Sequence, residues 1–305
     1  VEMRCTSRAF ALAALCAVFS LWAIASGPMN LWPGEPPGPK ATTNPEVNTT
    51  KPSDHLTGGK TVIRLGNITV PTSTFYPAPA RTNTGAAVVV FPGGGYRILA
   101  WDLEGTEICE WLNSIGVNAV LVKYRVPEPN GIPRYQEPLA DAQRAIGVTR
   151  LHASEWKIDP NRVGVIGFSA GGDLAALVSN TFENRTYTPV DQADSQSCRP
   201  DFVMLIYPAY LVPQVDSEQL APELHVSAET PPTFLVQTED DPIHVENSLF
   251  YYVALKRAKV PAEMHLYSKG GHGYGLRHTD LEVTTWPTLA TEWLRSRGVL
   301  NRGAH

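Results

Sequence analysis

The chain has 305 residues, of which 43% are hydrophobic and 18% are charged, and its formal net charge is -5 at pH 7. This composition is ordinary for a globular protein and is sufficient to bury one large core. The acidic balance, together with the lack of any basic cluster in the sequence, argues against a nucleic-acid partner.

The first 25 residues have the pattern of an export signal. Arg4 and Arg8 precede an apolar run from Ala9 to Ala25, which ends in a small-residue sequence at residues 23–25. A positive start, a short apolar run and such a cleavage site are typical of a bacterial-type signal peptide. The alternative is an uncleaved anchor, but the run is slightly short for a membrane-spanning helix. We therefore expect a secreted or periplasmic protein with no stable membrane association after cleavage.

A segment rich in proline, threonine and glycine follows over about residues 26–55. It has no apolar periodicity, and its prolines favour an extended, flexible tether. Simple disorder is an equally good interpretation. The rest of the chain, residues 56–305, is expected to form one domain.

Short apolar runs and helical stretches alternate through this domain. Residues 68–75 alternate at period two and predict an early edge strand, whereas the run AAVVVF at residues 86–91 predicts a strand buried on both faces. Further strands are expected at residues 117–122, 163–168, 202–207, 233–237 and 262–267. Helices are expected at residues 106–115, 138–153, 170–180, 245–258 and 285–297. This alternation predicts an α/β fold with a mostly parallel central sheet and helices on both faces.

A G-x-S-x-G sequence at residues 167–171 has Ser169 at its centre. It ends a predicted buried strand and opens a predicted helix, which is the context in which this motif presents a nucleophilic serine. The glycines keep side chains out of a strained turn that lifts the hydroxyl above the sheet. The N–H of Ala170, at the start of the helix, can then donate to an oxyanion. The simpler alternative is a glycine-rich turn with a helix-capping serine.

Three consecutive glycines follow the first buried strand, at residues 93–95. Such a loop folds tightly and leaves backbone N–H groups unshielded, so Gly94 and Gly95 are predicted to be the second source of oxyanion donors. By itself the run could be an ordinary flexible turn. The two glycine motifs, in this order and on neighbouring predicted strands, are much more specific together than either is alone.

Only one histidine, His272, lies in a glycine-rich loop after the last predicted strand, and it is the predicted base. His278 is its nearby competitor and lies further from the strand. The acid that orients the base is expected between Ser169 and His272, directly after a strand. Three carboxylates, at Glu239, Asp240 and Asp241, follow the strand predicted at residues 233–237. Asp241, which directly precedes a proline, is preferred over Asp240.

With these residues identified, the chain resembles serine esterases of the α/β-hydrolase fold that are related to bacterial acetylxylan and feruloyl esterases. The resemblance covers about residues 68–300 and rests on PGGGY (92–96), KYRVP (123–127), PLADAQRA (138–145), GFSAGG (167–172), DDPIHVENS (240–248) and GGHGYGL (270–276). It implies that residues 56–305 are a catalytic domain. The triad it implies consists of Ser169, Asp241 and His272, and the oxyanion hole of Gly94, Gly95 and Ala170.

Two residues depart from the pattern of these relatives. Pro92 stands where many related esterases have a histidine, and Asp173 stands where the xylan-esterase-like members often have one. Because Asp173 lies one turn into the nucleophile helix, its charge is explained most simply by the favourable helix dipole.

The expected activity is that of a serine carboxylesterase acting on short, acetyl-like esters, and the resemblance suggests acetylated plant polysaccharide. Residues 181–200 and 209–230 are too short for a large lid, which argues against a lipase. No C-x-x-C or H-E-x-x-H spacing occurs, so no metal or cofactor is expected. Cys109 and Cys198, the two cysteines that follow the predicted signal peptide, are expected not to form a disulfide. The alternatives are a peptidase or amidase of the same fold and a non-catalytic binding module.

Overall fold

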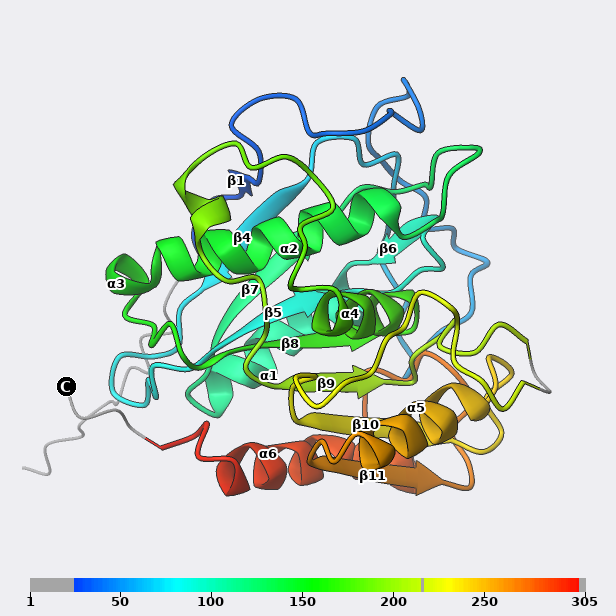
Figure 1. Cartoon of the computed structure of the whole chain (residues 1–305). Helices are drawn as coiled ribbons and strands as arrows, with labels where there is room; N and C mark the ends of the chain where they lie inside the picture. The colour runs from blue at the N-terminus through cyan, green and yellow to red at the C-terminus, as the bar shows by residue number, and fades with distance from the viewer. Residues whose placement is uncertain (1–24, 215–216, 302–305) are drawn as a thin grey trace, which may run out of the picture.

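The computed structural model of the protein describes residues 25–214 and 217–301, so the predicted signal peptide lies outside the described residues except for Ala25. Its centre is an eight-stranded sheet with the strand order β1-β4-β7-β5-β8-β9-β10-β11 (Figure 1). These strands are β1 (Met29–Asn30), β4 (Thr72–Tyr76), β7 (Asn118–Lys123), β5 (Ala87–Phe91), β8 (Val163–Phe168), β9 (Val203–Ile206), β10 (Thr233–Thr238) and β11 (Ala262–Tyr267). A small second sheet contains β2 (Val47–Asn48), β3 (Arg64–Gly66) and β6 (Ile98–Ala100).

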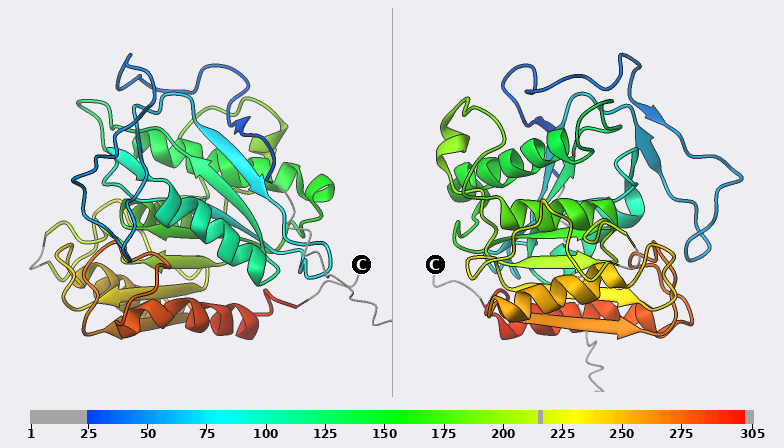
Figure 2. Two further views of the ribbon diagram at one scale, coloured as in Figure 1. Left: turned by 180° about the vertical axis from the view of Figure 1, so that it is seen from behind. Right: turned by 45° about the vertical axis from the view of Figure 1, so that its right-hand side comes forward.

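Helices cover both faces of the large sheet (Figures 1 and 2). One face packs against α2 (Gln136–Leu151), α4 (Ala170–Asn180) and α5 (Glu246–Arg257), and the other against α1 (Glu107–Ser114) and α6 (Trp286–Ser296). The shorter helices are η1 (Asp102–Thr106), α3 (Ala153–Trp156), η2 (Gln192–Ser195) and η3 (Glu282–Thr285), of which η1 is a π-helical turn. The predicted α/β architecture is therefore confirmed.

The central strand β5 shows how the sheet separates two cores. All of its five residues are fully buried, and it pairs in parallel with β7 on one side and β8 on the other. Ala87, Val89 and Phe91 contribute to the core under α2 and α4, whereas Val88 and Val90 contribute to the core under α1 and α6. Because side chains alternate between the faces of a strand, a continuous apolar run places apolar side chains in both cores.

The prediction of an edge strand at residues 68–75 is corrected by the structure. The strand is β4, which begins only at Thr72, and Ile68 makes a single isolated bridge to Val126. Pro71 separates the two, and a proline has no N–H to donate to a strand partner. Moreover, β4 is not at the edge, since β1 pairs with it on the side opposite β7.

The segment predicted as a flexible tether, residues 26–55, is instead packed on the domain from its start. Strand β1 lies beside β4 in both views of Figure 2, and the next two residues, Leu31 and Trp32, are 1% and 4% exposed. The indole Nε1 of Trp32 donates to Oδ1 of the buried Asp141 at 2.8 Å. The tether prediction is therefore wrong for these residues, because two large apolar side chains and an edge pairing hold them in place.

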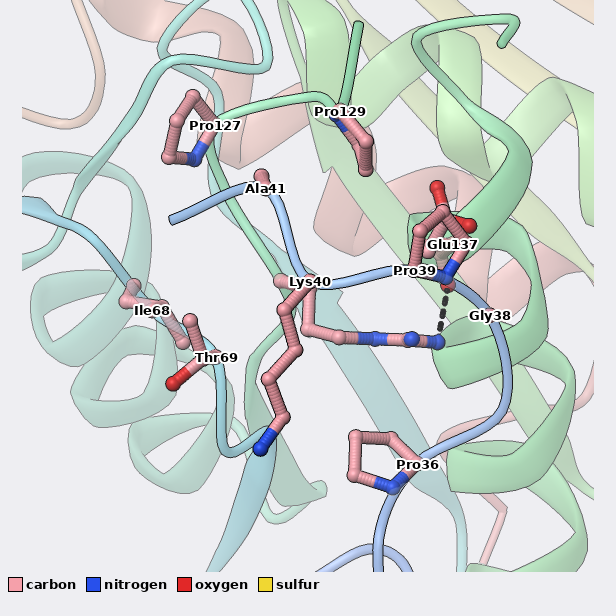
Figure 3. A pocket seen from close by; sticks show the side chains of 11 residues that line it. Pro36, Gly38, Pro39, Lys40, Ala41, Ile68, Thr69, Pro127, Pro129 and Glu137 are labelled. Atoms are coloured by element: carbon pink, nitrogen blue, oxygen red, sulfur yellow. Dashed lines mark hydrogen bonds between the residues drawn. The ribbon is translucent and has the colours of Figure 1, made fainter. Parts of the chain in front are cut away.

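The proline-rich part of the same segment also lies against the domain. Figure 3 shows Pro36, Pro39 and Lys40 between the loop that carries Ile68 and the N-terminal end of α2 at Glu137. The guanidinium of Arg125 donates to the carbonyl of Pro37 and forms an ion pair with Asp141 at 2.9 Å. The domain boundary predicted at residue 56 consequently moves towards the N-terminus, to about residue 29.

We predict that this segment contributes strongly to stability. Leu31→Ala should lower the free energy of unfolding by about 2–5 kcal/mol, because it removes a fully buried side chain from the core. Val70→Ala is the control, since Val70 is 54% exposed, and it should change stability by less than about 0.5 kcal/mol. Urea unfolding measures both. If Leu31→Ala changed the free energy of unfolding as little as Val70→Ala, the segment would not pack on the domain in solution.

Candidate active site

Ser169 lies in a sharp turn between β8 and α4, with φ of 51° and ψ of −120°. The flanking glycines are required by two close approaches of the backbone. A Cβ atom at Gly167 would lie 1.9 Å from the carbonyl oxygen of Gly171, and one at Gly171 would lie 2.1 Å from that of Phe91. Any side chain at either position would force the turn apart. The strand–turn–helix context predicted for the motif is thus present.

The glycine loop after β5 lies directly against this turn, since a Cβ atom at Gly93 would be 2.8 Å from Cβ of Ser169. Gly94 and Gly95 have φ of +135° and +64°, a backbone region that L side chains rarely adopt. Neither of their amides donates a hydrogen bond to another residue in the described part of the chain. As the first residue of α4, Ala170 likewise has an N–H without an acceptor inside the helix. Three amide donors therefore remain open beside Ser169.

Ser169, His272 and Asp241 come from the carboxyl ends of three parallel strands and form one hydrogen-bonded chain. Nε2 of His272 lies 2.8 Å from Oγ of Ser169, and its Nδ1 lies 2.8 Å from Oδ2 of Asp241. The carboxylate side chain is fully buried, whereas the imidazole is 21% exposed. Such a chain can take a proton from the serine hydroxyl while the buried acid holds the imidazole in one tautomer.

Further contacts fix the Asp241 carboxylate. Its Oδ2 accepts from Nε2 of Gln237 at 2.7 Å, and its Oδ1 accepts from the backbone N–H of Ile243 at 2.7 Å. The amide of Gln237 is itself oriented by Ser248, whose hydroxyl donates to its Oε1 at 2.8 Å. These contacts leave the carboxylate one orientation, towards His272.

The other residues considered for the base and the acid lie elsewhere. Asp240 accepts a hydrogen bond from the backbone N–H of Gly271 at 2.8 Å, and this bond lowers the pKa of Asp240. Asp240 therefore supports the loop of His272 without touching the imidazole. The side chains of Glu239 and His278 are exposed.

No sequence pattern indicates a buried carboxyl group under the glycine loop. Glu104, in η1, is 4% exposed; its Oε2 accepts from the backbone N–H of Gly93 at 2.7 Å and its Oε1 from the hydroxyl of Tyr207 at 2.9 Å. The ring of Tyr207 packs edge-on against His272 with centroids 5.0 Å apart. Burial raises the pKa of Glu104. Through its two hydrogen bonds, Glu104 connects the glycine loop to Tyr207, whose ring packs against the imidazole. No sequence motif distinguishes Glu104 from the neighbouring Glu107.

A second buried carboxyl group, Asp173, lies on the other side of the loop. It is 1% exposed, and its Oδ2 accepts from the hydroxyl of Tyr96 at 2.8 Å, while its Oδ1 has no hydrogen-bond partner among the described residues. Burial raises the pKa of Asp173 to about 7. The helix dipole is therefore not a sufficient account of this residue. Asp173 connects the nucleophile helix to Tyr96, the residue that follows Gly95.

Comparison with known proteins supports the α/β-hydrolase fold of the chain. A family model for the alpha/beta hydrolase fold matches residues 88–227. The solved structure of an acetyl ester-xyloside bifunctional hydrolase from Caldicellulosiruptor lactoaceticus is 33% identical, with 90% of this chain and 97% of that chain covered and a TM-score of 0.69. The chain belongs to the α/β-hydrolase family.

Two curated proteins are similar to this chain over part of their length. An acetylxylan esterase from Xylanibacter ruminicola is 30% identical over 216 residues, which are 63% of this chain and 42% of that protein. An endo-1,4-beta-xylanase B from Butyrivibrio fibrisolvens is 31% identical over 204 residues, 61% of this chain and 32% of that protein. The chain thus spans less than half of either relative. The predicted resemblance to α/β-hydrolase esterases is confirmed.

In residues 25–214 and 217–301, no group of three or more His, Cys, Asp or Glu side chains is placed to hold a metal ion. None of the helices in those ranges combines the length and apolarity needed to cross a membrane. Cys109 and Cys198 are buried free thiols.

We predict that Asp173 makes stability fall as the pH rises. Its pKa is raised from 3.8 to about 7 on folding, so the unfolded chain ionises first, and stability is lost progressively between about pH 4 and pH 7. Asp173→Asn removes this titration and still accepts from Tyr96, so the variant should gain up to about 4 kcal/mol over wild type across that window.

Urea unfolding of both proteins at a series of pH values from 4 to 8 measures this difference. A constant difference between them at every pH would show that Asp173 does not titrate in that window.

Proposed function

We propose that the protein is a serine carboxylesterase in which Ser169 is the nucleophile, His272 the base and Asp241 the acid that orients it. The observation that carries the proposal is the hydrogen-bonded chain of these three side chains at the carboxyl end of the sheet, with 2.8 Å at each step. Open amides at Gly94, Gly95 and Ala170 beside the same hydroxyl support their assignment as the oxyanion hole.

In the proposed reaction, His272 takes the proton of Ser169 as Oγ attacks the carbonyl carbon of the ester. The negative charge that develops on the carbonyl oxygen is stabilised by the open amides. The imidazolium then protonates the departing alkoxide, which leaves an acyl group on Ser169. A water molecule, deprotonated by His272, attacks this acyl-enzyme, and the acid leaves as Oγ recovers its proton.

The proposed substrates are short-chain esters such as acetyl groups on plant polysaccharide. The names of the similar proteins support this choice, since they include an acetylxylan esterase and an acetyl ester-xyloside hydrolase. The two segments considered as lids also support it. Residues 181–200 are held against α2, where Arg144 pairs with Asp191 and Asp194, and residues 209–230 contain no helix in their described part.

Export to the periplasm or the medium is part of the proposal, because the apolar pattern of residues 1–25 is that of a signal peptide. An exported enzyme would encounter a polymeric substrate outside the cytoplasm. Mass determination of the N-terminus of the protein recovered from its native host tests this directly.

The acid is tested by two isosteric variants. Asp241→Asn should lower kcat by about three to four orders of magnitude, because the amide favours the wrong imidazole tautomer. Asp240→Asn can still accept from Gly271 and should stay within about tenfold of wild type, since Asp240 makes no contact with the reacting groups. Steady-state kinetics on p-nitrophenyl acetate give both values, and the opposite ranking would assign the role to Asp240.

The reaction class and acyl length are tested together. A fluorophosphonate probe should label the wild type and not Ser169→Ala. The value of kcat/KM on p-nitrophenyl acetate should exceed that on the palmitate ester by at least about tenfold, or about 1.4 kcal/mol. Labelling elsewhere would refute the serine mechanism, while preference for palmitate with activation at an oil surface would indicate a lipase.

A further inference from the structure

A column of stacked side chains forms one wall beside the candidate active site. The ring of Tyr210 stacks against the ring of Tyr96, with centroids 6.1 Å apart and 20° between the planes, and the guanidinium of Arg134 lies over the Tyr210 ring, 4.0 Å from its centroid. These three residues come from different loops, after β5, after β9 and before α2. They meet only because the carboxyl ends of the strands converge there.

Two contacts place the column at the reacting groups. A Cβ atom at Gly95 would lie 3.7 Å from the hydroxyl oxygen of Tyr210, so this hydroxyl stands over the proposed oxyanion loop. The residue before it, Ala209, donates its backbone N–H to the carbonyl of Ser169 at 3.0 Å. Tyr210 is thus within reach of whatever part of an ester extends from Ser169 over Gly95.

Two members of the column, Tyr210 and Arg134, carry donors that the described part of the protein does not use. The hydroxyl of Tyr210 and the guanidinium of Arg134 make no hydrogen bond to any described residue, although Tyr210 is only half-buried and Arg134 is exposed. By contrast, the guanidinium groups of Arg125, Arg144, Arg150, Arg185 and Arg277 all donate to protein acceptors. The guanidinium of Arg134 lies over the Tyr210 ring, and its N–H groups remain free to donate.

We propose that Tyr210 and Arg134 form a subsite for the sugar ring that carries the ester, with their free donors bonded to its hydroxyl oxygens. This inference rests on the proposed esterase function. Because the ring of Tyr210 already packs against Tyr96 and the guanidinium of Arg134, the sugar is held by hydrogen bonds at the edge of the column rather than by stacking. A guanidinium edge presents parallel N–H groups, which suit two neighbouring hydroxyl oxygens.

The charges around the column favour a neutral sugar over an acidic one. The carboxyl of Asp173 interacts electrostatically with both Arg134 and Glu223, and Tyr135 interacts with the same three groups. An anionic sugar would meet these two carboxyls as well as the guanidinium. A neutral pyranose such as xylose takes the hydrogen bonds without that repulsion.

The column is rigid before any substrate binds. Tyr96 is fully buried, its hydroxyl is bonded to Asp173, and its ring also packs edge-on against Tyr124 at 6.3 Å. The stacking against this fixed ring and the contact with Arg134 therefore restrict the position of the Tyr210 ring. Such fixed donors lose little conformational freedom when they bind a ligand.

The test compares a sugar ester with an ester that has no sugar. On acetylated xylotriose, Tyr210→Phe should lower kcat/KM about fivefold, the effect of one neutral hydrogen bond, and Arg134→Ala about tenfold or more. On p-nitrophenyl acetate both variants should stay within about twofold of wild type. Arg295→Ala, an exposed arginine of α6, is the matched control and should leave both substrates unchanged.

Binding is measured separately from turnover. Unacetylated xylotriose should inhibit hydrolysis of p-nitrophenyl acetate competitively by the wild type, with an inhibition constant raised about fivefold in Tyr210→Phe. Thermal melts of the variants provide the folding control, and Tyr210→Phe keeps the ring and its stacking.

Equal losses on the two substrates would overturn the subsite and leave only a structural role, and so would unchanged kinetics on acetylated xylotriose. Wild-type activity on p-nitrophenyl acetate with none on acetylated xylotriose would also overturn it, without affecting the esterase proposal. A wild type inactive on both esters, and unlabelled by the fluorophosphonate, would refute the proposed function itself.

Discussion

The close approach of three backbone segments around Ser169 is the constraint on which the rest of the site depends. At Gly167 and Gly171 the chain leaves no room even for a Cβ atom, and the carbonyl of Phe91 at the end of β5 is one of the groups in the way. The positive φ of Ser169 is maintained only because the central strands β5 and β8 and the helix α4 are packed this tightly. The close packing of these backbone segments therefore sets the positions of the Ser169 hydroxyl, the N–H of Ala170 and the start of the glycine loop.

This packing leaves buried polar groups that the fold would otherwise avoid. Glu104 and Asp173 lie on either side of the glycine loop, and burial raises the pKa of both carboxyls. Burying a carboxyl group destabilises a domain, yet each of these two accepts a hydrogen bond that holds the loop or its neighbour Tyr96. Burying these carboxyl groups lowers the stability of the domain, but their hydrogen bonds fix a loop whose amides remain open.

The features that could be predicted from the sequence are those that depend on a local pattern of residues. Strands β5, β8 and β11 and helix α4 repeat apolar residues at the period of their structure, and their predicted ends agree with the observed ones to within one residue. The glycines of the elbow could be recognised because their spacing reflects a steric requirement. Strand β1 has only two residues, Met29–Asn30, which show no period, and the neighbouring prolines suggested a tether. Its pairing depends on burial of Leu31 and Trp32 against residues more than a hundred positions away, such as Asp141.

Tyr96 links the chemistry of the loop to the wall beside it. It follows Gly95 directly, so its backbone belongs to the glycine loop that lies against Ser169, while its ring belongs to the column with Tyr210 and its hydroxyl donates to Asp173 of the nucleophile helix. The contact between Tyr96 and Asp173 therefore helps to position both the column and the loop. The proposed sugar subsite at Tyr210 and the proposed oxyanion donor at Gly95 are consequently joined by one buried residue. In the proposed subsite, contacts with the sugar would hold the ester at Ser169, so binding energy gained away from the ester would be available at the transition state.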